Sequence, residues 1–316
     1  MTARAARSWT GRGMGLRNLG VAACVLALLS GCTGTPAVPT STPTSPDSFT
    51  LATLPHLDGS TASIPLISLI MQELGDVPKV LADNVEASTT PTAYASLACG
   101  TANPKGSVVI AYEPTQLTKD AIASCTPLEF HPIGRDALVF VVNEKNPVSS
   151  LTTEQYKGIY AGEITNWKDV GGTDHKIVAY QQSASSGSQA LLEKHVMGKA
   201  ELAKAPAETV IGDKGVLTEG LANYDNTENA IGYSVFYYVS QLYAAPDAKV
   251  LKADGVAPST QTISDGTYPY VNDFYAAIRA DEPESSPARR IVAWLESPEG
   301  QRAIADAGYV AGATAG

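Results

Sequence analysis

The chain has 316 residues and a formal net charge of −10 at pH 7, with 32 acidic and 22 basic side chains. This acidic surplus excludes proteins that bind nucleic acid or anionic membrane surfaces through basic patches. The length allows one large domain or two lobes of ordinary size once a leader segment is set aside.

The first 31 residues are predicted to be a lipoprotein signal peptide. They contain four arginines, no acidic residue, and an apolar run from Val21 to Leu29. The run is shorter than the roughly 20 residues that span a bilayer, and it ends in Leu29-Ser-Gly-Cys32. This ending resembles the lipobox of bacterial lipoproteins, which implies cleavage before Cys32, lipidation of Cys32 and an extracytoplasmic protein anchored to the cell membrane. The alternative is a short hydrophobic helix with an incidental cysteine.

Residues 32–48 are predicted to be a flexible tether, because Pro, Thr and Ser dominate them and they lack an apolar face. Removing the signal peptide removes four arginines and takes the net charge from −10 to −14. Cys99 and Cys125 remain as the thiols of the folded part. They form either one disulfide or two separate buried thiols, and an oxidising compartment favours the disulfide.

Residues 49–316 alternate predicted helices and strands, which is typical of an α/β fold. In chain order we expect a helix over 64–74, strands over 107–112 and 137–142, a helix after the capping-box pattern Thr152-x-x-Gln155, a strand over 176–180, and helical stretches over 189–197 and 289–305. The apolar stripes of these helices indicate packing against a core.

Three segments rich in small hydroxyl residues precede predicted helices, over 58–63, 88–92 and 183–188. A helix start offers unpaired N–H groups and about half a positive charge, so converging helix starts hold an anion without a lysine. The alternative for each segment is that its Ser or Thr only caps its own helix. The occurrence of three such segments favours an anion site.

Motifs for catalysis or metal binding are missing from the sequence. It contains no Gly-x-Ser-x-Gly elbow, no Gly-x-x-x-x-Gly-Lys loop and no His-Glu-x-x-His pair. The four histidines are far apart, and none has a metal-ligand partner at helical spacing. We therefore expect that the protein is not an enzyme and has no resident metal or cofactor.

Several motifs together resemble one known family. They are Asp58-Gly-Ser-Thr-Ala-Ser-Ile-Pro65, Gly134-Arg-Asp-Ala-Leu-Val-Phe-Val-Val-Asn143 with Asn146-Pro147, Gly158-Ile-Tyr-Ala-Gly-Glu-Ile-Thr-Asn-Trp-Lys-Asp-Val-Gly-Gly172, Ser186-Gly-Ser188, Ala230-Ile-Gly-Tyr233 and Tyr268-Pro269. Over residues 50–312 the chain is similar to the phosphate-binding proteins of high-affinity phosphate ABC transporters, within class II of the periplasmic-binding-protein family.

The resemblance implies a two-lobed Venus-flytrap fold in which each lobe is a mixed sheet flanked by helices. Lobe 1 would comprise about 49–140 and 260–316, and lobe 2 about 141–259. The ligand-binding residues would be Ser60, Thr61, Ser63, Thr90, Thr92, Glu113, Gln182, Ser186, Gly187 and Ser188. The resemblance also implies a monomer that delivers phosphate or a similar small anion to a permease and an ATPase.

Glu113, in Tyr112-Glu-Pro114, matches the family's carboxylate that accepts the proton of a protonated phosphate. Such an acceptor discriminates against sulfate, which has no proton to offer. The alternative is an exposed acid at the end of a strand.

One departure from the family concerns the expected arginine before the Ser-Gly loop and the acid that holds it. Gln182 and Ala184 occupy these places. Loss of a charge-assisted hydrogen bond costs about 1.5–3 kcal/mol. Arg135 and Lys105 are candidates to replace the charge. The competing hypotheses are therefore a different small polar solute or oxyanion, or a surface sensor or scaffold without a transport role.

Overall fold

The computed structural model of the chain describes residues 49–50, 52–75, 77–82, 85, 87–100, 106–184, 186–206, 210–211, 228–242 and 247–312. The predicted signal peptide, the tether, Cys32 and Lys105 lie outside these residues. Within the described part, no helix combines the length and apolar character needed to cross a membrane.

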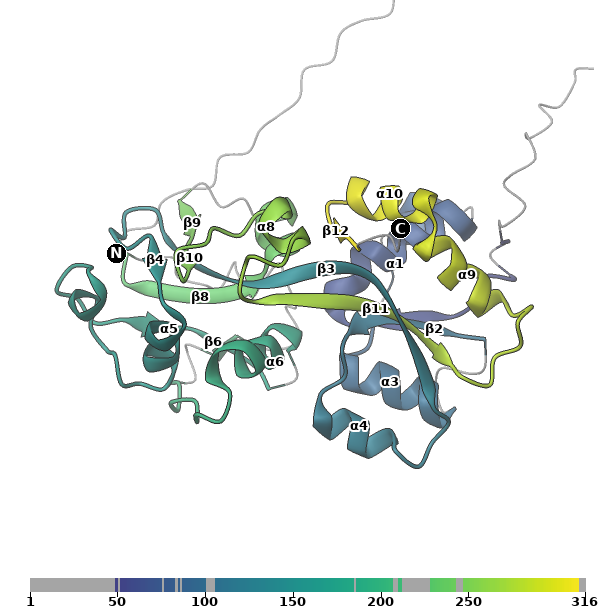
Figure 1. Ribbon diagram of the computed structural model, residues 1–316, viewed down its shortest axis with the longest axis horizontal. Helices are drawn as coiled ribbons and strands as arrows, with labels where there is room; N and C mark the ends of the chain where they lie inside the picture. Colours follow the sequence, from purple (N-terminus) through teal and green to yellow (C-terminus); the bar gives the residue numbers. More distant parts are fainter. Residues whose placement is uncertain are drawn as a thin grey trace, which may run out of the picture. The chain divides into compact units, whose positions relative to one another are not determined.

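The fold is α/β, with a mixed sheet at its centre (Figure 1). The main sheet has the order β1 (Leu57–Gly59), β2 (Val108–Tyr112), β11 (Val271–Arg279), β3 (Leu128–Asn143), β8 (Ala230–Val235) and β5 (Val178–Ala179), and both β9 (Ala248–Val250) and β12 (Val310–Ala311) pair with β3. Two small parallel pairs join β4 (Ser150–Leu151) to β10 (Lys252–Ala253) and β6 (Gln181–Gln182) to β7 (Val210–Ile211).

The long strand β3 divides this sheet into two parts. Residues 128–137 of β3 pair with β11, and residues 138–142 pair with β8. We call β1, β2, β11, β12 and the N-terminal part of β3 the first sheet half, and β5, β8, β9 and the C-terminal part of β3 the second sheet half. All five residues of β2 are buried, because helices cover both faces of the sheet there.

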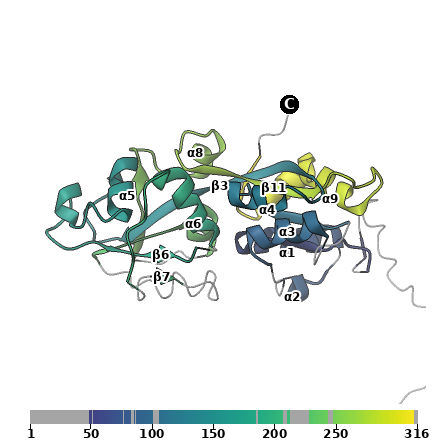
Figure 2. The ribbon, with the colours of Figure 1, turned by 90° about the horizontal axis from the view of Figure 1, so that it is seen from below.

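Helices flank the strands in both halves. They are α1 (Ile64–Gly75), α2 (Lys79–Ala82), α3 (Thr90–Cys99), α4 (Gln116–Ile122), α5 (Thr153–Tyr160), α6 (Gly187–Leu192), α8 (Thr260–Ser264), α9 (Pro287–Glu296) and α10 (Pro298–Asp306), with 3₁₀ turns over Thr61–Ser63 and Trp167–Val170 and π-helical turns over Glu193–Met197 and Tyr238–Leu242. Figure 1 shows α3 and α4 on one side of β2 and β11, and α9 and α10 on the other. The strand β6, which pairs with β7 in a separate small sheet, lies next to α6 (Figure 2).

The predicted helical stretch over 289–305 is two helices, which corrects the expectation of one continuous stripe. Ser297 lies at the break, where its Oγ donates to the carbonyl of Trp294 at 2.7 Å and accepts from the N–H of Gly300 at 3.2 Å. Pro298 follows as the first residue of α10, a place where its missing N–H costs nothing. The apolar residues Ile291, Leu295 and Ile304 are nevertheless buried, as the stripe predicts.

A disulfide joins Cys99 at the end of α3 to Cys125 beyond α4. The sequence leaves open either one disulfide or two separate buried thiols, and the structure has the disulfide. The disulfide ties together two helices that contact each other and that flank β2 in the sequence. It therefore braces the segment in which Glu113 follows β2.

Candidate functional site

The first hydroxyl segment runs from β1 into the 3₁₀ turn over Thr61–Ser63. Ser60 and Ser63 are both buried. The N–H of Ser60 donates to the carbonyl of Ile110 at 3.1 Å, and Ser63 Oγ lies 2.7 Å from the Ser60 carbonyl and 2.5 Å from that of Ile110. The Ser63 hydroxyl thus holds the turn against β2. The side chain of Thr61 lies outside the described part of the chain.

A buried aspartate joins the first hydroxyl segment to the second. Asp58 Oδ1 accepts from the N–H groups of Gly59 at 2.7 Å and of Ser88 at 2.8 Å. Asp58 Oδ2 accepts from Ser88 Oγ at 2.7 Å. Both donors of Ser88 are therefore bonded to an anion of the protein itself. Asp58 stands in one of the motifs above, but its role is not visible in the sequence because its partner lies 30 positions away.

The second hydroxyl segment starts α3, and its N-cap residue does not cap the helix with its side chain. Thr89 is the N-cap, but its hydroxyl makes no cap bond and lies 2.9 Å from Thr92 Oγ1. Thr115 and Thr152, at the starts of α4 and α5, do accept bonds from their own helices. The capping alternative therefore does not account for Thr89. Thr90 is half-buried in the first turn, and Thr92 is exposed.

Glu113 follows β2, and its side chain is 44% exposed. Its Oε1 lies 2.8 Å from Nζ of Lys119, and its Oε2 lies 3.4 Å from Nζ of Lys194. The hydrogen bond from Lys119 lowers the pKa of Glu113, and the nearby charge of Lys194 adds to the effect. Glu113 is therefore an ionised hydrogen-bond acceptor at neutral pH.

Lys194 lies 81 positions after Glu113 in the sequence, in the π-helical turn that continues α6. Its Nζ also donates to Asn272 Oδ1 at 2.8 Å. Lys194 is not among the site residues predicted from the sequence. Its distance of eight residues from Ser186, about two turns along the helix that starts there, is a signal that would have pointed to it.

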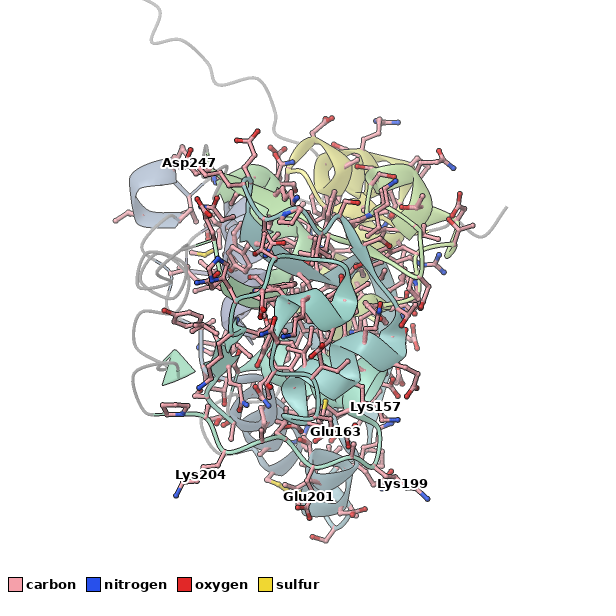
Figure 3. All side chains as sticks on the ribbon, turned by 90° about the vertical axis from the view of Figure 1, so that its left-hand side faces the viewer. Lys157, Glu163, Lys199, Glu201, Lys204 and Asp247 are labelled. Atoms are coloured by element: carbon pink, nitrogen blue, oxygen red, sulfur yellow. A yellow bond between two sulfur atoms is a disulfide. The ribbon has the colours of Figure 1, made fainter. Side chains whose placement is uncertain are left out.

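Arg135, Lys199 and Lys204 have different surroundings. Arg135 donates through Nε to Asp273 Oδ1 at 3.1 Å and through Nη1 to the carbonyl of Ser264 at 2.7 Å. Lys199 and Lys204 are exposed and point outwards at the end of the second sheet half (Figure 3). Neither Arg135 nor these lysines supplies the charge that Gln182 lacks.

The third hydroxyl segment is organised by Gln182. Its Nε2 donates to the carbonyl of Tyr233 at 2.8 Å, and its Oε1 accepts from Ser186 Oγ at 2.5 Å. Its backbone N–H donates to the hydroxyl of Tyr233 at 2.9 Å. Ser186 is the N-cap of α6 without a side-chain cap bond, so the capping alternative also fails for Ser186.

Gly187 brings the third segment to the end of β2. A Cβ on Gly187 would lie 3.6 Å from the ring of Tyr112, the residue before Glu113. Ser188 follows, half-buried, in the same turn of α6. The hydroxyl of Tyr112 donates to Asp136 Oδ2 at 3.2 Å, and burial raises the pKa of Asp136 to about 7.

The three predicted segments therefore all have contacts with β2 or with its neighbour β1: the first through Ile110 in the middle of β2, the second through Asp58 of β1, which pairs with Val109, and the third through Tyr112 at the end of β2. N–H groups of helix starts and hydroxyl groups are donors suited to oxyanions, and the carboxylate of Glu113 is suited to accept a ligand proton. No cluster of metal-binding side chains occurs among the residues that the structure describes.

Comparisons with known proteins agree with this chemistry. The model of the PBP superfamily domain matches residues 44–296. The phosphate-binding protein PstS of Bacillus subtilis is 26% identical over 257 residues, which cover 80% of this chain and 79% of the relative. Protein SphX of Synechococcus elongatus is 24% identical over 223 residues, 67% of this chain and 63% of the relative.

Solved structures with a similar fold include two phosphate-transport proteins. A putative phosphate ABC transporter substrate-binding protein with bound phosphate from Clostridium perfringens has a TM-score of 0.63 and 23% identity, and the match covers 84% of this chain and 99% of that one. An ABC-type phosphate transport receptor from Vibrio cholerae has a TM-score of 0.61 and 24% identity, with 81% and 99% covered.

Proposed function

We propose, because this chain belongs to the PBP superfamily, that it binds inorganic phosphate outside the cytoplasm and delivers it to the permease and ATPase of an ABC transporter. The relatives named as phosphate-binding proteins and the phosphate-bound structure of similar fold support this ligand. Two lobes, formed by about 49–140 with 260–316 and by about 141–259, would close around it.

The observation that carries the proposal is the meeting of donors and an ionised acceptor near the end of β2. Gly187 approaches Tyr112 there, and Lys194 approaches Glu113. Backbone N–H groups and the hydroxyls that do not already donate within the protein would hold the phosphate oxygens, and Glu113 would accept a phosphate proton. Sulfate has no proton at neutral pH, so the ionised carboxylate would repel it.

Isothermal titration of the purified full-length chain with phosphate and with sulfate tests this function. We expect heat with phosphate and none with sulfate. The variant Glu113→Gln should reduce the difference in affinity between phosphate and sulfate, since an amide offers a donor to sulfate. Glu163→Gln is the matched control, because Glu163 is an exposed acid at the outer end of the second sheet half (Figure 3). Absence of heat with millimolar phosphate would refute the proposal.

The membrane anchor is a separate part of the proposal and rests on the sequence before Cys32. Metabolic labelling with a palmitate analogue should mark the wild-type chain in the membrane fraction. The variant Cys32→Ala should carry no label and leave that fraction. Equal labelling of both chains would show that Cys32 is not the lipid site.

A second candidate ligand is another small polar solute, and the neutral amide of Gln182 is the observation that favours it. Native mass spectrometry of the purified chain would identify a solute that remains bound after purification. Recovery of phosphate alone would reject this candidate, whereas recovery of a different solute would replace phosphate in the proposal.

A further inference from the structure

The amide of Gln182 has an orientation that its neighbours determine. The carbonyl oxygen of Tyr233 can only accept a hydrogen bond, so the group 2.8 Å from it must be the amide nitrogen of Gln182. The amide oxygen therefore faces Ser186 Oγ, at 2.5 Å. The opposite orientation would place two oxygens together at the Tyr233 carbonyl.

This orientation determines the direction of the hydrogen bond from Ser186. An amide oxygen only accepts, so the hydroxyl of Ser186 must donate its single hydrogen to Gln182. The remaining capacity of Ser186 Oγ consists of lone pairs. Towards a ligand, Ser186 is consequently an acceptor and not a donor.

Buried groups hold this arrangement in place. The backbone N–H of Gln182 donates to the hydroxyl of Tyr233, which in turn donates to Gln189 Oε1. Gln189 Nε2 donates to Glu193 at 2.9 Å. Tyr233 is 2% exposed and Gln189 is 3% exposed, so the bond between these two residues is shielded from water. Burial also raises the pKa of Tyr233, which therefore keeps its hydrogen.

We infer that Gln182 is a specificity-determining positioning residue that makes Ser186 a hydrogen-bond acceptor, so that the site selects the doubly protonated, monobasic form of phosphate. This inference rests on the proposed phosphate binding. Ser186 and Glu113 would each accept one of the two protons of monobasic phosphate. The dibasic form has one proton and leaves one acceptor facing an unprotonated oxygen, which is unfavourable. An arginine in place of Gln182 would donate to the anion and leave the hydrogen of Ser186 available to donate as well.

Titration of the full-length chain with phosphate at pH 5.5 to 8.5 tests the inference. Above the second pKa of phosphate, the apparent association constant should fall by about tenfold per pH unit, in step with the monobasic fraction. Gln182→Met removes the amide oxygen and frees the hydrogen of Ser186, so the pH dependence should flatten. Ser186→Ala, which removes the acceptor, should flatten it too. Gln181→Met is the matched control, because Gln181 donates to Ala203 and does not contact Ser186.

Titratable groups around this pair require one further control. The pKa of Tyr233 is raised by burial, and that of Glu113 is lowered by its bond from Lys119, so neither titrates in this range. Among the residues that the structure describes, Lys194 and Glu193 are further charged neighbours. Asp136 does titrate near pH 7, and it bonds to Tyr112, whose ring faces Gly187. Asp136→Asn should therefore keep the pH dependence of binding.

The outcomes separate this inference from the phosphate function. An association constant that does not change with pH, or a Gln182→Met variant that keeps the wild-type slope, would overturn the inference while phosphate binding stands. If Asp136→Asn abolished the pH dependence of the association constant, that dependence would belong to Asp136, and the inference would be overturned as well. Absence of phosphate heat at every pH would refute the phosphate function and the inference together.

Discussion

Nζ of Lys194 lies 3.4 Å from Oε2 of Glu113, so a cation from the helical segment after α6 meets the carboxylate that follows β2. The two residues are 81 positions apart in the sequence. Lys119, which lies in α4 only six positions after Glu113, contacts the other oxygen of this carboxylate. Through Lys194, Glu113 therefore connects α6 and the π-helical turn after it to the end of β2.

Removing Lys194 should weaken phosphate binding more than removing Lys119. Lys194→Met removes the positive charge contributed from the π-helical turn after α6, and we expect about fivefold weaker binding, or roughly 1 kcal/mol. Lys119→Met should change the affinity less than twofold, because Lys119 of α4 pairs with Glu113 only six residues away and brings no charge from the segment after α6. Titration calorimetry at low and moderate salt measures both. Equal effects of the two substitutions would contradict the distinction.

Two glycines near the site should respond differently to alanine. A Cβ on Gly59 would lie 1.9 Å from the carbonyl oxygen of Ile110, so Gly59→Ala must separate β1 from β2. We expect a loss of about 2–4 kcal/mol in the free energy of unfolding. Gly187→Ala meets only the Tyr112 ring, at an ordinary 3.6 Å, and should leave that free energy within about 0.5 kcal/mol. Urea denaturation compares them, and similar losses would contradict the close approach of Gly59 to Ile110.

The buried carboxyl of Asp136 should make stability depend on pH. Its pKa is about 7 in the folded protein, and that of an unfolded aspartate is about 4. The folded protein therefore binds the extra proton between these values, and the stability that this group contributes falls as the pH rises from about 4 to about 7. Asp136→Asn should remove that fall, which amounts to roughly 2–4 kcal/mol. Urea denaturation at pH 5 and pH 8 provides the test, and a constant difference between variant and wild type would contradict it.

The disulfide between Cys99 and Cys125 should contribute to stability by restricting the unfolded chain. It closes a loop with a sequence separation of 26 residues, for which we expect about 3 kcal/mol. The double variant Cys99→Ser, Cys125→Ser should lower the urea midpoint as much as reduction of the wild type does. A midpoint that reduction leaves unchanged would show that the bond does not restrain the folded region.

Local patterns in the sequence predict much of the fold. The capping box of Thr152 and Gln155 is confirmed by bonds of 3.2 Å and 2.9 Å, and both partners lie within three residues of each other. The strand expected over 107–112 is β2, and the helix expected over 64–74 is α1. The prediction of one helical stretch over 289–305 is wrong, because Ser297 and Pro298 divide it into two helices.

The candidate site could be predicted only as a set of segments. Hydroxyl residues before helices are visible in the sequence because a helix start is a local feature. The use of each hydroxyl is not visible: Ser63 bonds to Ile110, and Ser88 bonds to Asp58. These partners lie 47 and 30 positions away, so the packing of strands and loops decides them.

The sequence by itself determined the α/β alternation, the three hydroxyl segments and the presence of Gln182 where an arginine is expected. Each of these depends on residue identity or on neighbours a few positions apart. Only the tertiary structure decided that Gln182 is held by Tyr233, 51 positions away, and that Lys194 reaches Glu113. A hydrogen bond needs two groups within about 3 Å, and for distant residues that distance is set by how the sheet halves and helices pack.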